Sequence, residues 1–219
     1  MSTFDTATHN RTIFLPEATD FGGLSLFDSL RRRCTTRRIS SRPLPAQCLA
    51  DLLWAAFGIN RAFGPFDVPS RTAGSASNSQ EIDLYVARQD GVYLYEPHDS
   101  LLKPVVAGDV RPLALTPGQK GLTPLAPLQL IFVADVDRLV RTPGFQEPGL
   151  HDAEVQKAYY YVDTGLIAQN VYLFAAASGL AAWFHNCDRP GLGHALSLRP
   201  SQRVLFAQSV GYPEEAAAL

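Results

Sequence analysis

One long helical pattern limits the choice of folds more than any other feature of this sequence. Asp152 can cap a helix that continues to Ala177, and Gly179 can end it, which gives about 27 residues or about 40 Å at about 1.5 Å per residue. From Leu166 onward the pattern is apolar on nearly every side. A helix that is apolar all round must be covered by protein, so we expect a long buried central helix. One small domain covers such a helix incompletely, and we therefore expect a homodimer.

The composition is that of a globular protein. The 219 residues are 46% hydrophobic and 18% charged, which argues against a disordered, collagen-like or coiled-coil chain. Residues 1–23 alternate polar and small side chains, and we expect an extended N-terminal arm there, followed by a single domain over residues 24–219. The formal net charge of −2 gives no reason to expect a polyanion-binding surface. We therefore expect no nucleic-acid partner.

The cysteines and the apolar stretches bear on the compartment. The sequence has three cysteines, Cys34, Cys48 and Cys187. Their number and spacing indicate neither a disulfide framework nor a zinc site, so we expect a reducing compartment and a cytoplasmic protein. The longest apolar stretch, Val171 to Phe184, is about 14 residues long, which is too short to cross a bilayer. It predicts a buried core helix and no membrane partner.

Two further helices and one long loop are expected in the first half of the domain. Apolar residues at helical spacing predict short helices at residues 24–33 and 48–57, and Gly58 can end the second one. Residues 61–80 are rich in Gly, Pro, Ser and Asn. A loop of this length is uncommon in a compact domain unless it carries function.

The strands follow shorter patterns. The β-prone runs at residues 82–87 and 92–95 are joined around an Asp-Gly pair, which predicts a hairpin. Residues 128–134 and 204–210 predict two buried strands. Proline and glycine interrupt residues 96–127 too often for an assignment.

Several catalytic and metal-binding motifs are absent. The sequence has no G-x-S-x-G, no G-x-x-x-x-G-K-[ST] and no H-E-x-x-H. The histidines are His9, His98, His151, His185 and His194. They share no spacing that would build a metal site on one element, so we expect no metal and interpret each as a surface or packing residue.

A cationic cluster is the first candidate for chemistry. Arg33 and Arg37 lie four residues apart, with Thr35 between them, where the first helix ends. Guanidinium groups bind phosphate through two parallel hydrogen bonds, and a hydroxyl adds a donor, so the cluster could hold a phosphorylated small molecule. The alternative is a set of exposed arginines that stabilise a helix C-terminus.

An amide-rich loop is the second candidate. Ser75, Asn78 and Gln80 lie in a run of small and polar residues directly before the hairpin. Amide side chains offer both donors and acceptors, which suits a heterocycle that presents both kinds of edge. The alternative is an ordinary polar loop, and composition does not distinguish the two.

The order of these motifs resembles that of the FMN-dependent nitroreductase superfamily. The family's R-x-S-x-R/K motif is similar to residues 33–37, which read Arg-Cys-Thr-Thr-Arg, and its P-S-x-x-N-x-Q motif is similar to residues 74–80, which read Gly-Ser-Ala-Ser-Asn-Ser-Gln. Further similarity lies in the central helix, in Ser178-Gly179-Leu180 and in the closing run at residues 208–213. The resemblance spans about residues 24 to 213. Residues 58–61, 80–86 and 91–95 look most like a bacterial subgroup related to azoline-oxidising dehydrogenases.

The resemblance implies a fold, a cofactor and a site. The implied fold is α+β, with a mostly antiparallel central sheet flanked by helices, a long buried helix and a dimer interface that shelters two FMN molecules. Arg33 and Thr35 would contact the phosphate and ribityl chain, and Arg37 the pyrimidine edge. The amide-rich loop of this subunit or its partner would line the same flavin, and the backbone near His185 would face its N5. The implied cofactor-binding set is Arg33, Cys34, Thr35, Arg37, Ser75, Asn78, Gln80, His185 and Asn186.

The implied activity is a ping-pong oxidoreductase in which NAD(P)H reduces FMN and an electron-poor small-molecule substrate, such as a nitroaromatic or a quinone, is then reduced. The flavin carries the redox chemistry, so no side chain need be catalytic. One alternative is a dehydrogenase that oxidises a substrate carbon with a base such as Lys157 or one of Tyr159, Tyr160 and Tyr161. Another is a flavin-binding protein without turnover.

The C-terminal tail departs from the family pattern. Relatives usually carry a Lys or Arg shortly after the Gly-Tyr-Pro, whereas Glu214 and Glu215 follow here. Acidic side chains near a phosphate would repel it. We therefore expect both glutamates to point away from the cofactor, into solvent.

Overall fold

The computed structural model describes residues 11–19, 23–121, 124–145 and 151–214. Within them a seven-stranded sheet has the order β1-β6-β5-β4-β7-β9-β8, and every pairing is antiparallel. These strands are β1 (Ile13–Phe14), β4 (Ile82–Ala87), β5 (Gly91–Glu96), β6 (Leu101–Ala107), β7 (Leu128–Asp135), β8 (Ala181–His185) and β9 (Gln202–Gly211). The predicted α+β class with an antiparallel sheet is confirmed.

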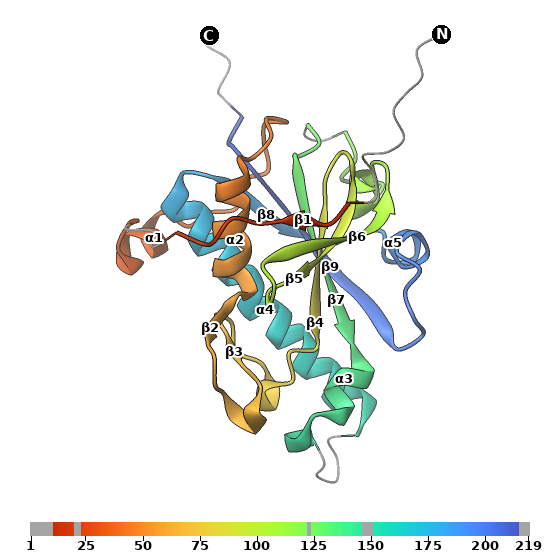
Figure 1. Ribbon diagram of the computed structural model, residues 1–219. Coiled ribbons are helices and arrows are strands. Elements are labelled where there is room, and N and C mark those ends of the chain that lie inside the picture. Colours follow the sequence, from red (N-terminus) through yellow and green to blue (C-terminus); the bar gives the residue numbers. More distant parts are fainter. Residues whose placement is uncertain (1–10, 20–22, 122–123, 146–150, 215–219) are drawn as a thin grey trace, which may run out of the picture.

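Helices cover both faces of the sheet, with α1, α2 and α4 on one side and α5 on the other (Figure 1). The helices are α1 (Leu26–Arg32), α2 (Ala46–Phe57), α3 (Val136–Arg141), α4 (Ala153–Ser178) and α5 (Arg189–Ala195). The shorter elements are a second sheet of β2 (Ile59–Arg61) and β3 (Ser70–Arg71), and the 3₁₀ turns η2 (Pro65–Asp67), η3 (Ala76–Asn78), η4 (Arg111–Ala114) and η5 (Pro143–Phe145). The long loop at 61–80 therefore contains its own small hairpin.

Strand β7 shows why the core has two halves. All eight of its residues are buried. Alternate side chains, such as Leu130 and Phe132, join the core on the α2 and α4 side, whereas Ile131 and Val133 join the core beneath α5 and η4. A strand buried on both faces reads as a continuous apolar run, which is why this strand could be predicted from the sequence.

Helix α4 begins and ends where the sequence predicted. Asp152 is its N-cap, and its carboxylate accepts hydrogen bonds from the backbone N–H groups of Glu154 and Val155. Gly179 ends the helix in the left-handed conformation, with φ of 68°. The caps fix the helix at 26 residues, and the prediction of one long helix is confirmed.

One expectation about this region is wrong. Residues 171–184 do not form a single core helix, because the chain turns at Gly179 and residues 181–185 pair with β9 as strand β8. Helix α4 itself is buried along one face. Ile167 and Val171 are fully buried, whereas Val162 and Leu166 remain 60% and 46% exposed. The described residues of a single chain therefore leave one apolar face of α4 uncovered, which agrees with the expectation that one small domain covers this helix incompletely.

The N-terminal arm and the unassigned middle region gain structure from long-range pairing. Within the arm, β1 adds an edge strand by pairing with β6, and Thr19 donates two hydrogen bonds to the carboxylate of Asp51. Residues 96–127 contain β6 and η4. The rest of the arm, residues 1–10 and 20–22, lies outside the described residues.

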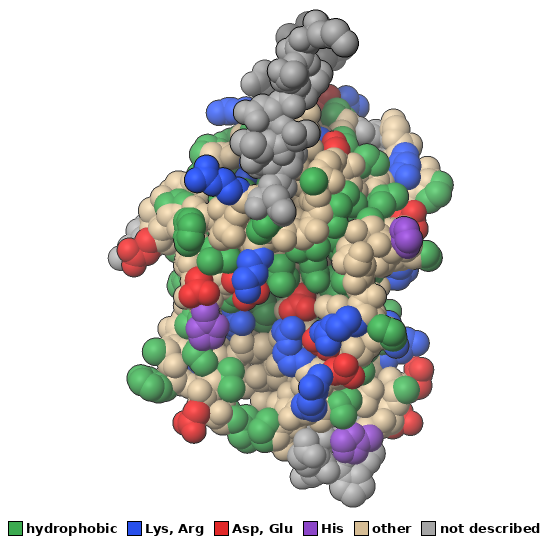
Figure 2. Space-filling model, turned by 45° about the vertical axis from the view of Figure 1, so that its right-hand side comes forward, with side chains coloured by type: hydrophobic (Ala, Val, Ile, Leu, Met, Phe, Trp, Pro, Cys, Tyr) green, Lys and Arg blue, Asp and Glu red, His purple; other side chains and the backbone are tan. Residues whose placement is uncertain are grey.

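The described residues contain no helix that is both long enough and apolar enough to cross a bilayer. Acidic and basic side chains lie beside one another across the middle of the face drawn in Figure 2. This mixture fits the near balance of 19 basic and 21 acidic residues.

Gly179→Ala is expected to lower the free energy of unfolding by about 1–2 kcal/mol, because an L-residue is strained in the left-handed conformation. Apart from Gly179 and its two chain neighbours, no heavy atom of the described residues lies within 4 Å of where the added Cβ would stand, so the loss reports on backbone conformation. Urea titration measures it. Gly179→Asn is the control, since asparagine tolerates this conformation and should lose less. Equal losses for the two variants would contradict the explanation.

Candidate functional site

The cationic cluster lies where α1 ends, beside the edge of strand β8. The backbone N–H of Arg33 closes the helix by donating to Ser29, and the N–H of Thr36 then donates to the carbonyl of Ala182 at 3.0 Å. This places residues 33–37 next to β8 and the last turns of α4. The exposed Cys34 is close to Thr36, with 3.3 Å between Sγ and Oγ1.

Two aromatic rings lie against the guanidinium groups of this cluster. The guanidinium of Arg33 lies 5.5 Å from the ring centre of Tyr172, and that of Arg37 lies 5.8 Å from the ring centre of Trp183. The hydroxyl of Tyr172 lies 3.1 Å from that of Thr35 and accepts a hydrogen bond from the backbone N–H of Phe184. The two arginines are therefore supported by groups more than 130 positions later in the chain.

The charges of these arginines are not neutralised within the described residues. Their neighbours in sequence are paired, since Arg31 binds Asp28 at 3.2 Å and Arg38 binds Glu214 at 2.8 Å. No carboxylate among the described residues forms an ion pair with Arg33 or Arg37. The cluster therefore presents two uncompensated guanidinium groups, as an anion-binding site requires.

The amide-rich loop uses most of its side-chain hydrogen bonds internally. The side-chain amide of Gln80 donates to the carbonyl of Pro69 and to Asn78, and the amide nitrogen of Asn78 lies 3.1 Å from the carbonyl of Val68. The hydroxyl of Ser75 accepts a hydrogen bond from the backbone N–H of Gln80. Asn78 and Gln80 thus shape the loop through their side-chain amides, a role that composition alone did not distinguish from binding a heterocycle.

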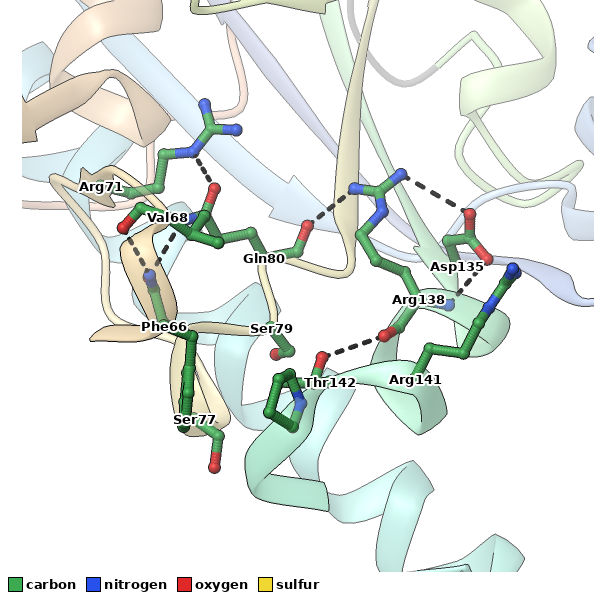
Figure 3. Close-up of a pocket in the computed structure, with 12 residues that line it drawn as sticks. Phe66, Val68, Arg71, Ser77, Ser79, Gln80, Asp135, Arg138, Arg141 and Thr142 are labelled. Carbon is green, nitrogen blue, oxygen red and sulfur yellow. Dashed lines mark hydrogen bonds and ion pairs between the residues drawn. The ribbon is translucent and has the colours of Figure 1, made fainter. Parts of the chain in front are cut away.

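Gln80 also accepts hydrogen bonds from two arginines that the sequence analysis did not place in the site. Arg71 Nε donates to the side chain of Gln80 at 2.6 Å, and Arg138 Nη1 donates to its backbone carbonyl at 2.7 Å. Both arginines line a cavity of about 460 Å³ between the loop and α3. Figure 3 shows the side chains that line it. Burial lowers the pKa of Arg71 to about 10, so it stays charged at neutral pH.

Two buried carboxyl groups lie behind the same loop. Asp163 of α4 accepts a hydrogen bond from the backbone N–H of Ala76, and Glu81 accepts one from the hydroxyl of Ser79. Burial, together with the neighbouring charge of Asp163, raises the pKa of Glu81 to about 7. Burial also raises the pKa of Asp163. The signal for this pair in the sequence is weak, because Glu81 directly follows the polar run at residues 77–80 and Asp163 lies 82 positions later in α4.

His185 serves the core and not the surface. Its ring nitrogens lie 2.8 Å from the hydroxyl of Ser209 and 2.9 Å from the carbonyl of Asn186, and its ring lies against that of Trp183 at an interplanar angle of 47°. Burial lowers the pKa of the imidazole, which favours the neutral form. The side chain of Asn186 is exposed. The His185 side chain is therefore engaged within the core, whereas that of Asn186 is accessible.

The cationic cluster and the amide-rich loop do not meet within one chain. The cluster contacts α4 at Tyr172, whereas the loop contacts it at Asp163. Nine residues of helix separate these two contacts, which is about 14 Å along the axis. No group of three or more metal-ligating side chains occurs among the described residues.

The residues considered as bases are engaged in structural contacts. Lys157 lies 3.6 Å from Glu154, one turn earlier on α4. Tyr161 packs edge-on against Phe206, and the ring of Tyr160 lies against that of Tyr161. These contacts support a surface role for Lys157 and a packing role for Tyr160 and Tyr161.

The tail carries an ion pair close to the cluster. Besides its ion pair with Arg38, Glu214 donates its backbone N–H to the carbonyl of that arginine. The expectation that Glu214 points freely into solvent is therefore met only in part, because its side chain is held at the surface. Glu215 lies outside the described residues.

Comparisons with known proteins agree with one another. Residues 30–212 match the model of the nitroreductase family. A Methanocaldococcus jannaschii protein provisionally named a nitroreductase is 30% identical over 168 residues, which cover 74% of this chain and 78% of that protein.

Solved structures show the same likeness. A Ralstonia eutropha protein with the same provisional name has a TM-score of 0.82 and 31% identity, and the match covers 95% of this chain and 92% of the other. A chain of the E. coli microcin synthetase McbBCD complex, solved with truncated pro-MccB17 bound, has a TM-score of 0.67 and 17% identity, with 98% and 84% covered. At that identity the second likeness concerns the fold alone.

Proposed function

This chain belongs to the nitroreductase family, and from that premise we propose that it is an FMN-dependent oxidoreductase. NAD(P)H is the proposed electron donor, and an electron-poor small molecule such as a nitroaromatic or a quinone is the proposed acceptor. The observation that carries the proposal is the pair of uncompensated guanidinium groups on Arg33 and Arg37.

The residues of the cluster fit FMN. The cofactor has a phosphate, and its pyrimidine edge carries hydrogen-bond acceptors. Both can accept hydrogen bonds from cationic side chains. Arg33 and the hydroxyl of Thr35 would hold the phosphate and the ribityl chain, while Arg37 would lie at the pyrimidine edge. FMN, when bound, supplies the two-electron chemistry. A guanidinium at that edge stabilises the negative charge that reduction leaves there. Tyr172 and Trp183 keep both guanidinium groups in place.

A homodimer is part of the proposal, because one chain holds the two halves of the site apart. Apolar side chains remain exposed on the two helices that pack beside the cluster. They are Leu26, Phe27 and Leu30 on α1 and Val162 and Leu166 on α4. Pairing two chains through these side chains would cover them. It would also allow the amide-rich loop of one subunit to approach the cationic cluster of the other.

The cytoplasm remains the proposed compartment. All three cysteines are free thiols, which suits a reducing environment.

Stopped-flow spectroscopy of the purified protein tests the proposal. The protein should purify yellow, and NADH or NADPH should bleach the flavin absorbance in a single turnover. Adding a quinone or a nitroaromatic compound should restore the absorbance. A flavin that a nicotinamide fails to reduce, but a substrate with an oxidisable carbon does reduce, would favour the dehydrogenase alternative. A flavin that neither compound reduces would favour a binding protein.

A further inference from the structure

The carboxyl groups of Glu81 and Asp163 form a buried pair whose charge is not compensated. Glu81 is fully buried, and Asp163 is 4% exposed. Neither takes part in an ion pair among the described residues. No group among the described residues donates a hydrogen bond to Glu81 Oε1, although the carboxyl group of Asp163 is its neighbour. A proton shared between the two carboxyl groups satisfies that oxygen, because one protonated carboxyl can donate to the other.

The charged groups around the pair form their hydrogen bonds and ion pairs with other residues. Arg138 of α3 faces Glu81, but its guanidinium binds the carbonyl of Gln80 and the carboxylate of Asp83. Arg71 of β3 binds the side chain of Gln80. Asp135, at the end of β7, approaches Glu81 through its backbone N–H, while its carboxylate binds Arg199. The pair therefore depends on its own proton to lower its charge from −2 to −1.

The loop in front of the pair is held in an unfavourable conformation. Ser77, Asn78 and Gln80 have φ values of 49°, 55° and 50°, which residues other than glycine rarely adopt. Such a conformation persists only where the surroundings hold it. The two carboxyl groups bind this loop from behind, Asp163 at Ala76 and Glu81 at Ser79, on either side of the first two strained residues.

We propose that Glu81 and Asp163 are positioning residues that share one proton and thereby hold the loop of residues 75–80 in the conformation that completes the FMN site. The inference rests on the proposed function, since it concerns the same site. With the proton present, the pair carries one negative charge and both contacts with the loop persist. Without it, two carboxylates repel each other in a buried space and the loop loosens.

The direction of the pH dependence follows. The pKa of Glu81 is raised from 4.5 to about 7 in the folded protein. A raised carboxyl pKa means that the ordered loop is favoured below pH 7 and loses support as the pH rises through it. If FMN binds only the protonated pair, the dissociation constant should rise about tenfold between pH 6 and pH 8, because each pH unit above the pKa removes about nine-tenths of the protonated form.

Fluorescence titration of FMN into the flavin-free protein between pH 6 and pH 8 tests this. Glu81→Gln replaces the acid by a neutral amide that still donates to Asp163, and its dissociation constant should stay constant over this range. Glu96→Gln, a Glu-to-Gln change on the surface of β5, should keep the tenfold dependence of the unchanged protein. An unchanged protein without pH dependence, or a Glu81→Gln variant that retains it, would overturn the inference.

Hydrogen exchange separates this inference from the proposed function, because it needs no flavin. In the flavin-free protein the amide of Ala76 should lose protection, after correction for intrinsic rates, between pH 6 and pH 8. It should not do so in Glu81→Gln, nor in Asp163→Asn if the first variant fails to fold. Constant protection of the unchanged protein would refute the inference by itself. FMN that fails to bind at any pH would refute the proposed function while leaving the exchange result to decide the inference.

Discussion

Replacing both Arg33 and Arg37 with alanine is expected to yield a colourless protein. A charge-assisted hydrogen bond contributes about 1.5–3 kcal/mol, so losing both guanidinium groups should weaken FMN binding by about 3–6 kcal/mol, or roughly a hundredfold to ten-thousandfold. The two side chains lie on aromatic rings at the surface and form no ion pair among the described residues. Their removal should therefore leave folding largely intact. Flavin absorbance per chain and FMN titration measure the effect.

The same stretch offers a matched control. Arg31→Ala with Arg38→Ala removes two charges as well, but both of these arginines are already paired, with Asp28 and Glu214 respectively. This double variant should keep its flavin, with affinity reduced by no more than a few-fold. Equal losses in the two double variants would mean that overall charge, and not a specific site, governs binding. Full flavin content in the first double variant would remove the basis of the assignment.

Placing a glutamate at Leu166 is expected to separate the subunits and release FMN together. The side chain is 46% exposed in a single chain, so the charge can remain hydrated in a monomer. In a symmetric dimer both copies of this glutamate would be buried without a charged partner. Even one uncompensated buried charge costs about 3 kcal/mol or more. The molar mass measured by light scattering should fall from about 48 kDa, twice the chain mass of 23.9 kDa, to the mass of one chain.

The control for Leu166→Glu is the same change at another exposed apolar residue. Val105 is 39% exposed and belongs to β6 of the sheet, not to α1 or α4. Val105→Glu should leave both the mass and the flavin content unchanged. A Leu166→Glu protein that is monomeric and still yellow would show that one chain binds FMN without its partner, contrary to the proposal.

The sequence predicted those elements whose signals are local. Helix α4 has a capping side chain at Asp152 and a left-handed glycine at Gly179, and both act within one turn of the helix end. The β4–β5 hairpin likewise has its turn residues next to it in sequence. Strand β8 was missed because residues 181–184 continue an apolar run, and only their pairing with β9 makes them a strand. Strand β6 was missed because Pro104 argues against a strand, yet it pairs with Tyr93 there.

In the candidate site, too, residues with a local sequence signal could be predicted, and residues placed by long-range contacts could not. The arginines at 33 and 37 could be found from residue type and spacing, since a guanidinium pair is recognisable in one stretch of sequence. The aromatic side chains that support them, Tyr172 and Trp183, come from elements far along the chain. The internal use of the Asn78 and Gln80 amides depends on where the carbonyls of residues 65–69 fall, which no spacing rule gives.

The position of residues 36–40 has a consequence for solubility. Beyond Ala182 the outer side of β8 has no neighbouring strand in the seven-stranded sheet, and an open edge of this kind can recruit other chains into aggregates. The N–H of Thr36 occupies a carbonyl on that edge, and Ile39 bridges to Pro213 just past the end of β9. The segment that follows Arg33 thus also shields the sheet from edge-to-edge association. Substitutions that loosen this segment are therefore expected to promote aggregation whether or not a ligand is bound.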